Sequence, residues 1–229
     1  MKKVIITAKK KMKRGMALTA LALALVLTMA TTKSYAQLDF GSDVVSRYIW
    51  RGWDFGNAVS VQPWMAYASG GFEVGAWSSW AIDAPGANEN DLYISYSTES
   101  FGLTVTDYYF PGGPDAEGSY GFFDYDPDMG AHIIEVLGSV GVDAFSAAAG
   151  VNVLGDDDNS IWLEAGYEIV STEDISAGLT AGLGNGLYTL DGDFMLTQLG
   201  LTASKDIFFA SYIINPDQEV SWLFFGVSF

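Results

Sequence analysis

The sequence predicts an all-β fold, an antiparallel transmembrane β-barrel of about 12 strands that follows a signal peptide. Three observations predict it: segments in which apolar and polar residues alternate, connections that are alternately short and long, and a last segment that ends in Phe229. No stretch after residue 36 is apolar over the roughly 20 residues that a membrane-spanning helix needs. The chain is therefore expected to cross a membrane with strands or not to cross it.

Residues 1–36 form the predicted signal peptide and residues 37–229 the predicted barrel. A basic segment without acids comes first, the apolar run MALTALALALVLTMA follows, and small residues precede the expected cleavage after Ala36. Eight of the 11 Lys and Arg residues and none of the 28 acidic residues lie in this segment, so the mature charge is 3 − 28, or −25. Such a charge excludes nucleic-acid binding through phosphate neutralisation and favours cations as partners.

The predicted strands are segments with two unlike faces. In NSIWLEAGYEIV, the apolar Ile161, Leu163 and Tyr167 share one face, and Glu164 and Glu168 share the other. This period of two is typical of a β-strand. The predicted strands are 38–53, 58–68, 71–82, 91–98, 101–110, 131–140, 144–154, 159–170, 174–184, 194–204, 207–214 and 219–229.

The connections between these strands fall into two sets that alternate along the chain. Short turns begin at positions 69, 99, 141, 171 and 204. Longer or acidic loops begin at positions 54, 83, 111, 155, 184 and 215. Short periplasmic turns that alternate with longer outer loops are typical of bacterial outer-membrane barrels. In the last strand, alternate apolar residues lead to a terminal Phe229, which resembles the signal that the barrel assembly machinery recognises.

A secreted β-sandwich is the alternative fold, because its strands alternate as well. The second face of a soluble sheet is normally rich in Lys, Glu and Thr. Here that face carries Gly, Ser, Ala and scattered acids, which suits a polar lumen better.

Alternation also predicts which charged residues line the lumen. If Tyr48 and Trp50 face lipid, Arg47 and Arg51 face inward, where a charge avoids the roughly 2–4 kcal/mol that Arg costs at the bilayer midplane. The same alternation predicts five inward carboxylates: Glu73, Asp91, Glu135, Glu164 and Glu168. These groups can brace the interior, form a constriction, or do both. Asp107 breaks the pattern because it falls in phase with Leu103 and Val105, and a β-bulge near the membrane edge would cure this.

Most of the mature chain resembles a known family, most specifically between Asp43 and Glu135, and the second half is similar mainly in its strand pattern. The segments that carry the likeness are DVVSRYIWRGWDFG, SVQPWMAY, GFEVGAWSSWA, DLYISYS, LTVTDYYFP, FFDYD and HIIEVLGSV. In this order they resemble the TorF-type family of bacterial outer-membrane porins. The resemblance implies an outer-membrane β-barrel that acts as a passive channel.

An enzyme and a metal site are the alternatives from other classes. Barrel lipid hydrolases place a serine beside a histidine on the lipid-facing wall. The one histidine is His132, residue 134 is Ile, and partners across the strands such as Ser95 or Ser146 stay open. Acidic loops with Asp124, Asp126 and Asp128, and with Asp156, Asp157 and Asp158, offer oxygen ligands, but the spacing is not that of an EF-hand. We therefore predict no catalytic residue, no metal site and no cofactor.

The expected function is a channel for small hydrophilic solutes in the outer membrane of a Gram-negative bacterium, with a mild preference for cations. A structural or adhesive barrel with a plugged lumen is the rival. The expected partners are outer-membrane lipid, small solutes and cations, and the assembly machinery through Phe229. The solute and a constricting role for loop 111–130 are left open.

The alternating connections generate a topology prediction. An epitope tag inserted in 111–130 should bind antibody on intact cells, because this loop is expected to lie outside. A tag at 141 should bind antibody only after permeabilisation. The opposite pattern would invert the proposed topology.

Overall fold

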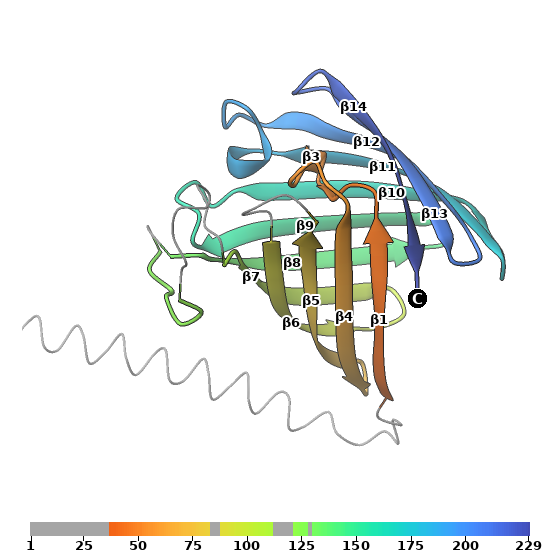
Figure 1. Cartoon of the computed structure of the whole chain (residues 1–229), viewed down its shortest axis with the longest axis horizontal. Coiled ribbons are helices and arrows are strands. Elements are labelled where there is room, and N and C mark those ends of the chain that lie inside the picture. Colours follow the sequence, from red (N-terminus) through yellow and green to blue (C-terminus); the bar gives the residue numbers. More distant parts are fainter. Residues whose placement is uncertain (1–36, 83–87, 112–120, 128–129) are drawn as a thin grey trace, which may run out of the picture. The chain divides into compact units, whose positions relative to one another are not determined.

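A computed structural model describes residues 37–82, 88–111, 121–127 and 130–229. Twelve antiparallel strands form a closed barrel in which each strand pairs with its neighbours in the chain, and β1 pairs with β14 (Figure 1). The predicted fold class and strand number are confirmed. The predicted signal peptide lies outside the described residues. Among the described residues, no helix has the length and hydrophobicity that a membrane crossing demands.

The barrel strands follow the predicted segments closely. The first six are β1 (Gln37–Val45), β4 (Ser60–Ser69), β5 (Phe72–Ala81), β6 (Asn88–Ser97), β7 (Phe101–Tyr109) and β8 (His132–Val142). The last six are β9 (Phe145–Leu154), β10 (Ile161–Ser171), β11 (Ile175–Gly184), β12 (Met195–Lys205), β13 (Phe208–Asn215) and β14 (Val220–Ser228). The other elements are β2 (Ile49–Trp50), β3 (Trp53–Asp54) and the 3₁₀ turn η1 (Gly186–Tyr188).

The two ends of the barrel differ as the connections predict. At the short-turn end, two or three residues join consecutive strands, as at Gly70–Gly71, where φ values of 61° and 83° fit the left-handed turn of a tight hairpin. At the long-loop end the connections are longer, and they include 46–59 and 185–194. The two sets alternate without exception along the chain.

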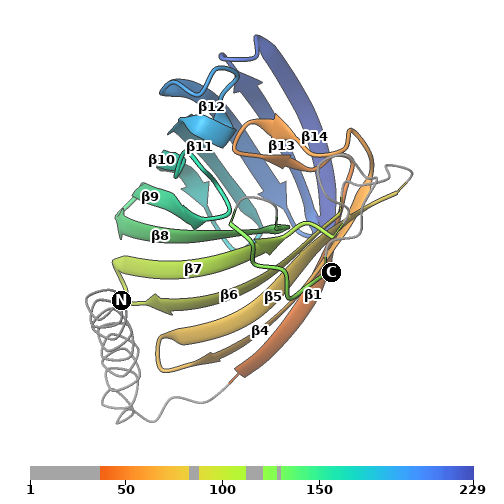
Figure 2. The ribbon, with the colours of Figure 1, turned by 90° about the vertical axis from the view of Figure 1, so that its left-hand side faces the viewer.

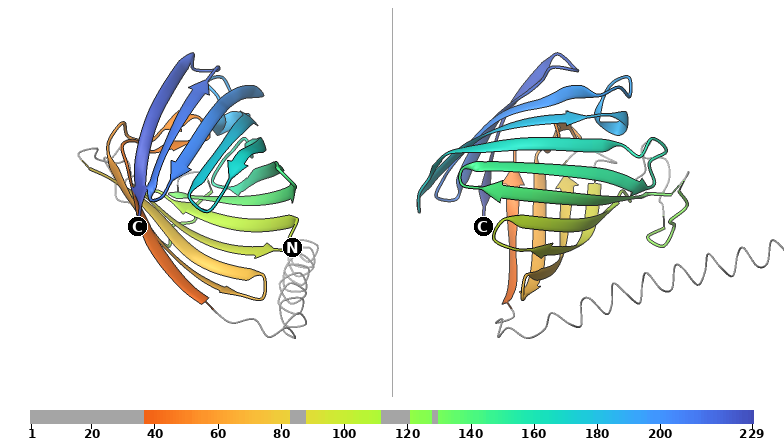
Figure 3. Two further views of the ribbon diagram at one scale, coloured as in Figure 1. Left: turned by 90° about the vertical axis from the view of Figure 1, so that its right-hand side faces the viewer. Right: turned by 180° about the vertical axis from the view of Figure 1, so that it is seen from behind.

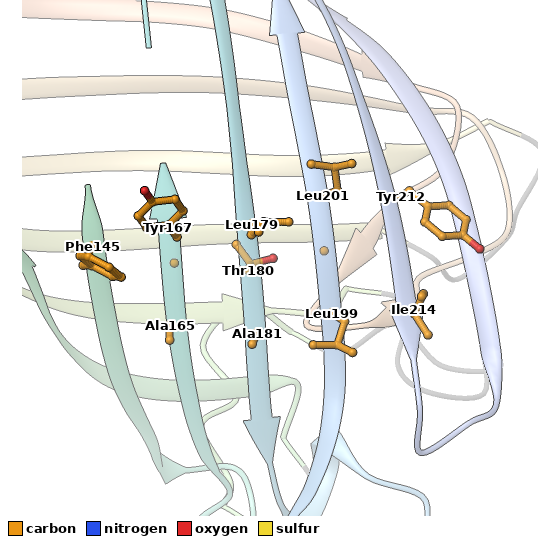
Figure 4. A pocket seen from close by; sticks show the side chains of 12 residues that line it. Phe145, Ala165, Tyr167, Leu179, Thr180, Ala181, Leu199, Leu201, Tyr212 and Ile214 are labelled. Carbon is orange, nitrogen blue, oxygen red and sulfur yellow. The ribbon is translucent and has the colours of Figure 1, made fainter. Parts of the chain in front are cut away.

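The outward wall of the barrel is apolar. Large side chains that share the outward face of the strands remain strongly exposed: Leu38, Phe40, Met65, Tyr67, Val74, Leu92, Ile94, Leu103, Val140, Leu163, Leu199, Leu223 and Phe225. Figure 4 shows part of this wall, where Phe145, Tyr167, Leu179, Leu201 and Tyr212 line a shallow groove of about 490 Å³ across β9–β13. Soluble proteins rarely expose apolar patches of this extent, which mark contact with a membrane or a partner.

The first predicted strand is too long. A strand over 38–53 is wrong, because β1 ends at Val45 and β4 begins at Ser60 directly opposite it. Residues 46–59 leave the wall and form a small hairpin, β2–β3, that we call the inner hairpin. Figure 2 shows it (orange) inside the ring of strands, toward β12, β13 and β14. Tyr48 is consequently buried and does not face lipid.

The barrel closes through a short seam between β1 and β14. Three residue pairs, Asp43–Ser228, Val44–Val227 and Val45–Gly226, match in register, whereas β1 and β4 match over nine. Backbone hydrogen bonds between Ser42 and Phe229, of 3.2 and 3.0 Å, extend the seam by one step. In Figures 1 and 3 the C-terminus therefore lies beside the middle of β1 rather than at its end.

The register of the seam predicts a specific cross-link. Ser42 and Phe229 exchange both backbone hydrogen bonds, so the next pair, Asp43–Ser228, is a non-hydrogen-bonded pair with a Cα separation of about 4.5 Å. This separation suits a disulfide. Because the chain has no cysteine, the variant Asp43→Cys/Ser228→Cys should oxidise to a cyclic form that migrates differently on a non-reducing gel after heating.

The control shifts one cysteine by a single position. Ser42→Cys/Ser228→Cys places the two thiols on opposite faces of the sheet, and we expect little cross-linking. Equal oxidation of both variants would show that the seam has another register.

Candidate functional site

The tip of the inner hairpin is a two-residue turn. Trp50 pairs with Trp53, and between them Arg51 and Gly52 have φ values of 50° and 79°, which is the pattern of a type I′ turn. A Cβ atom on Gly52 would lie 2.0 Å from the carbonyl oxygen of Thr197. Gly52 is therefore needed both for the turn and for the close contact of the hairpin with β12.

The inner hairpin contacts elements that do not adjoin its origin between β1 and β4. The fully buried Asn215 of β13 donates its Nδ2 hydrogen to the carbonyl oxygen of Gly52, at 2.9 Å. Trp53 Nε1 donates to the carbonyl oxygen of Tyr188 in η1, at 2.8 Å. A second loop, 185–194, thus folds inward to meet the hairpin. Together they cross the lumen at the long-loop end.

The side chain of Arg51 is the centre of this contact. Its Nη2 donates to Oε2 of Glu135 at 2.9 Å, and its Nη1 donates to the hydroxyl of Tyr188 at 2.6 Å. Nη1 also lies 2.7 Å from Oε1 of Glu135, a charge contact without hydrogen-bond alignment. Tyr108 donates to the same carboxylate at 2.9 Å. We call Arg51, Glu135, Tyr108 and Tyr188 the Arg51 cluster.

Aromatic rings enclose the charge of Arg51. The guanidinium carbon lies 4.3 Å from the ring centre of Trp50, 4.9 Å from that of Tyr188 and 5.2 Å from that of Trp162. Side-chain exposure is 6% for Arg51 and 2% for Glu135, so water screens the pair weakly. A buried ion needs such partners, because burying an unpaired charge is strongly unfavourable.

The protonation of Arg51 follows from the same contacts. Burial lowers the pKa of the guanidinium, but the hydrogen bond to Glu135 and the neighbouring Tyr188 raise it by more, so the pKa lies above its ordinary value. Arg51 therefore stays charged at every physiological pH. The ion pair acts as a permanent clamp rather than as a titrating switch.

The base of the hairpin lies beside two further acidic residues, Glu89 and Asp91. Tyr48 packs against Phe55 and Trp77, with ring centres 5.2 and 5.4 Å away. Burial first, and then the charges of Glu89 and Asp91, raise the pKa of Tyr48 well above its ordinary value, so its hydroxyl keeps the proton that hydrogen-bonds to Glu89. Both carboxyls are buried, and Oδ1 of Asp91 has no hydrogen-bond partner within the described residues.

The other predicted lumen residues lie apart from this cluster. Arg47 belongs to the inner hairpin and not to the barrel wall. Its side chain pairs with Asp54 of the same hairpin and is 32% exposed. Glu73 accepts a hydrogen bond from Tyr93 at 2.8 Å on the inward face near the short-turn end. Glu164 is half-buried on the inward face of β10, and Glu168 is exposed on the same face at a register shift. Whether these groups line a conducting path stays a prediction.

Asp107 remains on the outward face, and the expected bulge is absent. β7 keeps a regular register with β6 and β8. The carboxylate instead contacts Nδ1 of His132 and the hydroxyl of Tyr125, both at 2.7 Å. The described part of the loop at 121–127 covers this pair from outside, with the Tyr125 ring centre 3.9 Å from that of His132.

His132 is poorly placed for hydrolase chemistry. Its Nδ1 is held by Asp107, and its Nε2 lies 2.8 Å from the carbonyl oxygen of Phe122. Ser95 and Ser146 point inward from their strands, whereas His132 faces outward. Neither serine can therefore use this imidazole as a base. The contacts of His132 instead hold loop 121–127 on the wall.

In the acidic loop at 155–160, the carboxylate of Asp156 accepts hydrogen bonds from neighbouring residues. Oδ2 of Asp156 accepts hydrogen bonds from Asn152 Nδ2 and from the backbone of Ser160, both at 2.8 Å, which stabilise the 155–160 turn. Within the described ranges, no group of three potential ligands has metal-binding geometry. Asp128 lies outside those ranges.

Sequence reasoning placed Glu135 inward with Arg51 but missed the aromatic residues around them. Tyr188 lies in a segment expected to be an outer loop. Trp162 and Asn152 lie on regular strands, where no sequence pattern distinguishes them from their neighbours. The usable signal was the Arg51–Gly52 dipeptide between two tryptophans, since glycine in the second turn position marks a two-residue hairpin. It was obscured because the flanking aromatics also suit a lipid-facing strand.

The Arg51 cluster predicts unequal roles for the two arginines. Arg51→Leu leaves Glu135 buried without its ion, a loss of about 3–5 kcal/mol. Amide hydrogen exchange of residues 46–59 should accelerate by a factor of about 100 or more, while the barrel strands keep their protection. Arg47→Leu breaks a more exposed pair worth about 0–1 kcal/mol, and its exchange should change less than about tenfold.

The double variant Arg51→Leu/Glu135→Leu tests the cause. It removes both charges, so much of the lost protection should return. If all three variants exchange alike, the ion pair does not hold the hairpin.

Comparison with known proteins gives a family and no activity. A model of a family described as bacterial proteins of unknown function, Gcw_chp, matches residues 29–223. A comparison with curated proteins finds no match. The match includes every strand of the barrel except the end of β14, and it includes the inner hairpin and the Arg51 cluster. The chain therefore belongs to the Gcw_chp family of bacterial proteins.

Proposed function

We propose that this protein is an outer-membrane channel of the TorF type, through which small hydrophilic solutes diffuse passively, and that the inner hairpin is its constriction. The observation that carries the proposal is the contrast between the two faces of one closed sheet. The outward face is a wall of exposed apolar side chains, and the inward face carries carboxylates. Two such faces suit lipid outside and water inside.

The polar face continues to the short-turn end. Ser146, Ser139, Gly102 and Glu164 line a hollow of about 400 Å³ there. The hollow lies at the expected periplasmic end of the barrel. A solute that entered there would meet the aromatic side chains of the inner hairpin at the opposite end.

A structural or adhesive barrel with a plugged lumen is the second candidate. The specific observation in its favour is the same hairpin, since it contacts β8, β12 and β13 from its origin between β1 and β4. The two candidates differ in one measurable property, which is conductance. In both the channel and the plugged barrel, the assembly machinery would recognise the last strand through Phe229. The contacts of His132 favour a protein without enzymatic activity in both cases.

Gly52 provides the test of the constriction. Gly52→Ala would place a Cβ against the Thr197 carbonyl oxygen and strain a φ of 79°, so the hairpin should leave its seat. In planar bilayers we expect small single-channel currents from the wild type and severalfold larger currents from Gly52→Ala.

Gly192→Ala is the matched control. Gly192 has a similar φ of 84°, but nothing lies within 4 Å of its added Cβ, so this variant imposes strain without the collision. Its currents should equal those of the wild type. No current from any of the three proteins would favour the plugged barrel, and equal currents from all three would place the constriction elsewhere.

The charges of the lumen predict the ion preference. Both arginines are paired with carboxylates, which leaves Glu73, Glu164 and Glu168 on the inward face without a basic partner among the described residues. A field of one sign in a low-dielectric channel concentrates the opposite ion. The reversal potential in a KCl gradient should show a mild cation preference that weakens with salt, as screening shortens to about 10 Å at 0.1 M. A clear anion preference would contradict this assignment.

A further inference from the structure

A cavity of about 220 Å³ lies at the long-loop end, between the inner hairpin and the barrel wall. Six aromatic side chains form most of its lining: Trp50, Trp53, Phe55, Tyr108, Phe110 and Tyr188. Three come from the hairpin, one from β7, one from the residue that follows β7, and one from η1. Leu187, which is 51% exposed, also lines the cavity and connects it with the surface.

The polar groups of the lining are already engaged. Trp53 Nε1 donates to the Tyr188 carbonyl oxygen, and the Tyr108 hydroxyl donates to Glu135. Asn152 donates to Asp156 at 2.8 Å and accepts from the Tyr188 hydroxyl at 3.3 Å. A ligand that needs hydrogen bonds, such as a sugar, would find few unused partners here. The cavity therefore selects for an apolar ligand.

Charge excludes a second class of ligand. Aromatic cages can bind quaternary ammonium ions through the faces of their rings. Here Trp50 and Tyr188 already interact with the guanidinium of Arg51, at 4.3 and 4.9 Å from their ring centres. A second cation on these rings would be repelled by Arg51, and Glu135 neutralises the attraction of Arg51 for an anion. A neutral ligand is left.

We infer that this cavity is a binding site for a small neutral aromatic compound of one or two rings. A dry apolar cavity of about 150 Å³ in another protein binds benzene, so about 220 Å³ suits a bicyclic ring such as indole. Offset or edge-to-face contacts with tryptophan and tyrosine add to the gain from burial. The site goes beyond the proposed channel function and does not depend on it.

The test measures indole binding to the whole purified barrel in detergent. Equilibrium dialysis and saturation-transfer NMR should show saturable binding to the wild type. Ile133→Trp should weaken it at least tenfold, because Ile133 lines the cavity and takes no part in the Arg51 cluster. Leu190→Trp is the control, since Leu190 is 64% exposed and lies outside the lining. It should bind as the wild type does.

Partition of indole into the micelle is equal for all three proteins, so the difference between variants reports the site alone. Leu187→Trp, at the rim, gives a second blocking variant if Ile133→Trp fails to fold. Tetramethylammonium and methyl glucoside, a cation and a neutral sugar, should show no saturable binding. Equal indole binding by the wild type and the blocking variants, or tighter binding of either comparison compound, would overturn the inference. Bilayer conductance is a separate measurement, so a failed binding test leaves the channel proposal standing.

Discussion

The organisation of the lumen depends on one buried ion pair, between Arg51 and Glu135. A guanidinium with 6% exposure must be paired, and its partner lies on β8, across the lumen from where the hairpin leaves the wall. The pair thus fixes where the tip of the hairpin rests. Tyr108 donates a hydrogen bond to Glu135, Tyr188 accepts one from Arg51, and three aromatic rings surround the guanidinium. Removing one charge would leave the other buried and unpaired, which is strongly unfavourable.

The same constraint joins the inner hairpin to the aromatic cavity. Trp50 and Tyr188 cover the guanidinium and also line the cavity. A change in one arrangement therefore alters the other. The hairpin is short, and it is held at Gly52 by Asn215 of β13, at Trp53 by Tyr188 of η1 and at Tyr48 by Trp77 of β5. These anchors belong to different parts of the ring, so the hairpin also braces the barrel from inside.

The sequence predicted the barrel well because strands repeat one local rule. Alternation in segments such as Ile161–Ser171 shows both faces at once, and turn lengths give the order of the strands. Alternation fails as a guide where the position of a residue is set by a contact with a residue that is distant in the sequence. Tyr48 and Trp50 alternate with Arg47 and Arg51 as a strand would, yet β1 ends at Val45 and the segment turns inward to meet Glu135. Asp107 keeps the outward position that strand alternation gives it, although a charged side chain is not expected there. The residues that stabilise it, His132 and Tyr125, come from β8 and a loop.

The short seam between β1 and β14 has fewer paired residues than any other contact between neighbouring strands of the barrel. Below it, in the described part of the chain, the edge of β1 from Gln37 to Gly41 has no strand beside it, and above it the edge of β14 from Val220 to Phe224 is in the same position. Backbone groups without partners are unfavourable in hydrocarbon. Water and lipid headgroups can satisfy them only if the bilayer is thinner or disturbed along this line. In the membrane setting proposed for the barrel, the lipid shell would consequently be uneven, and the surrounding lipid would be least ordered beside β1 and β14.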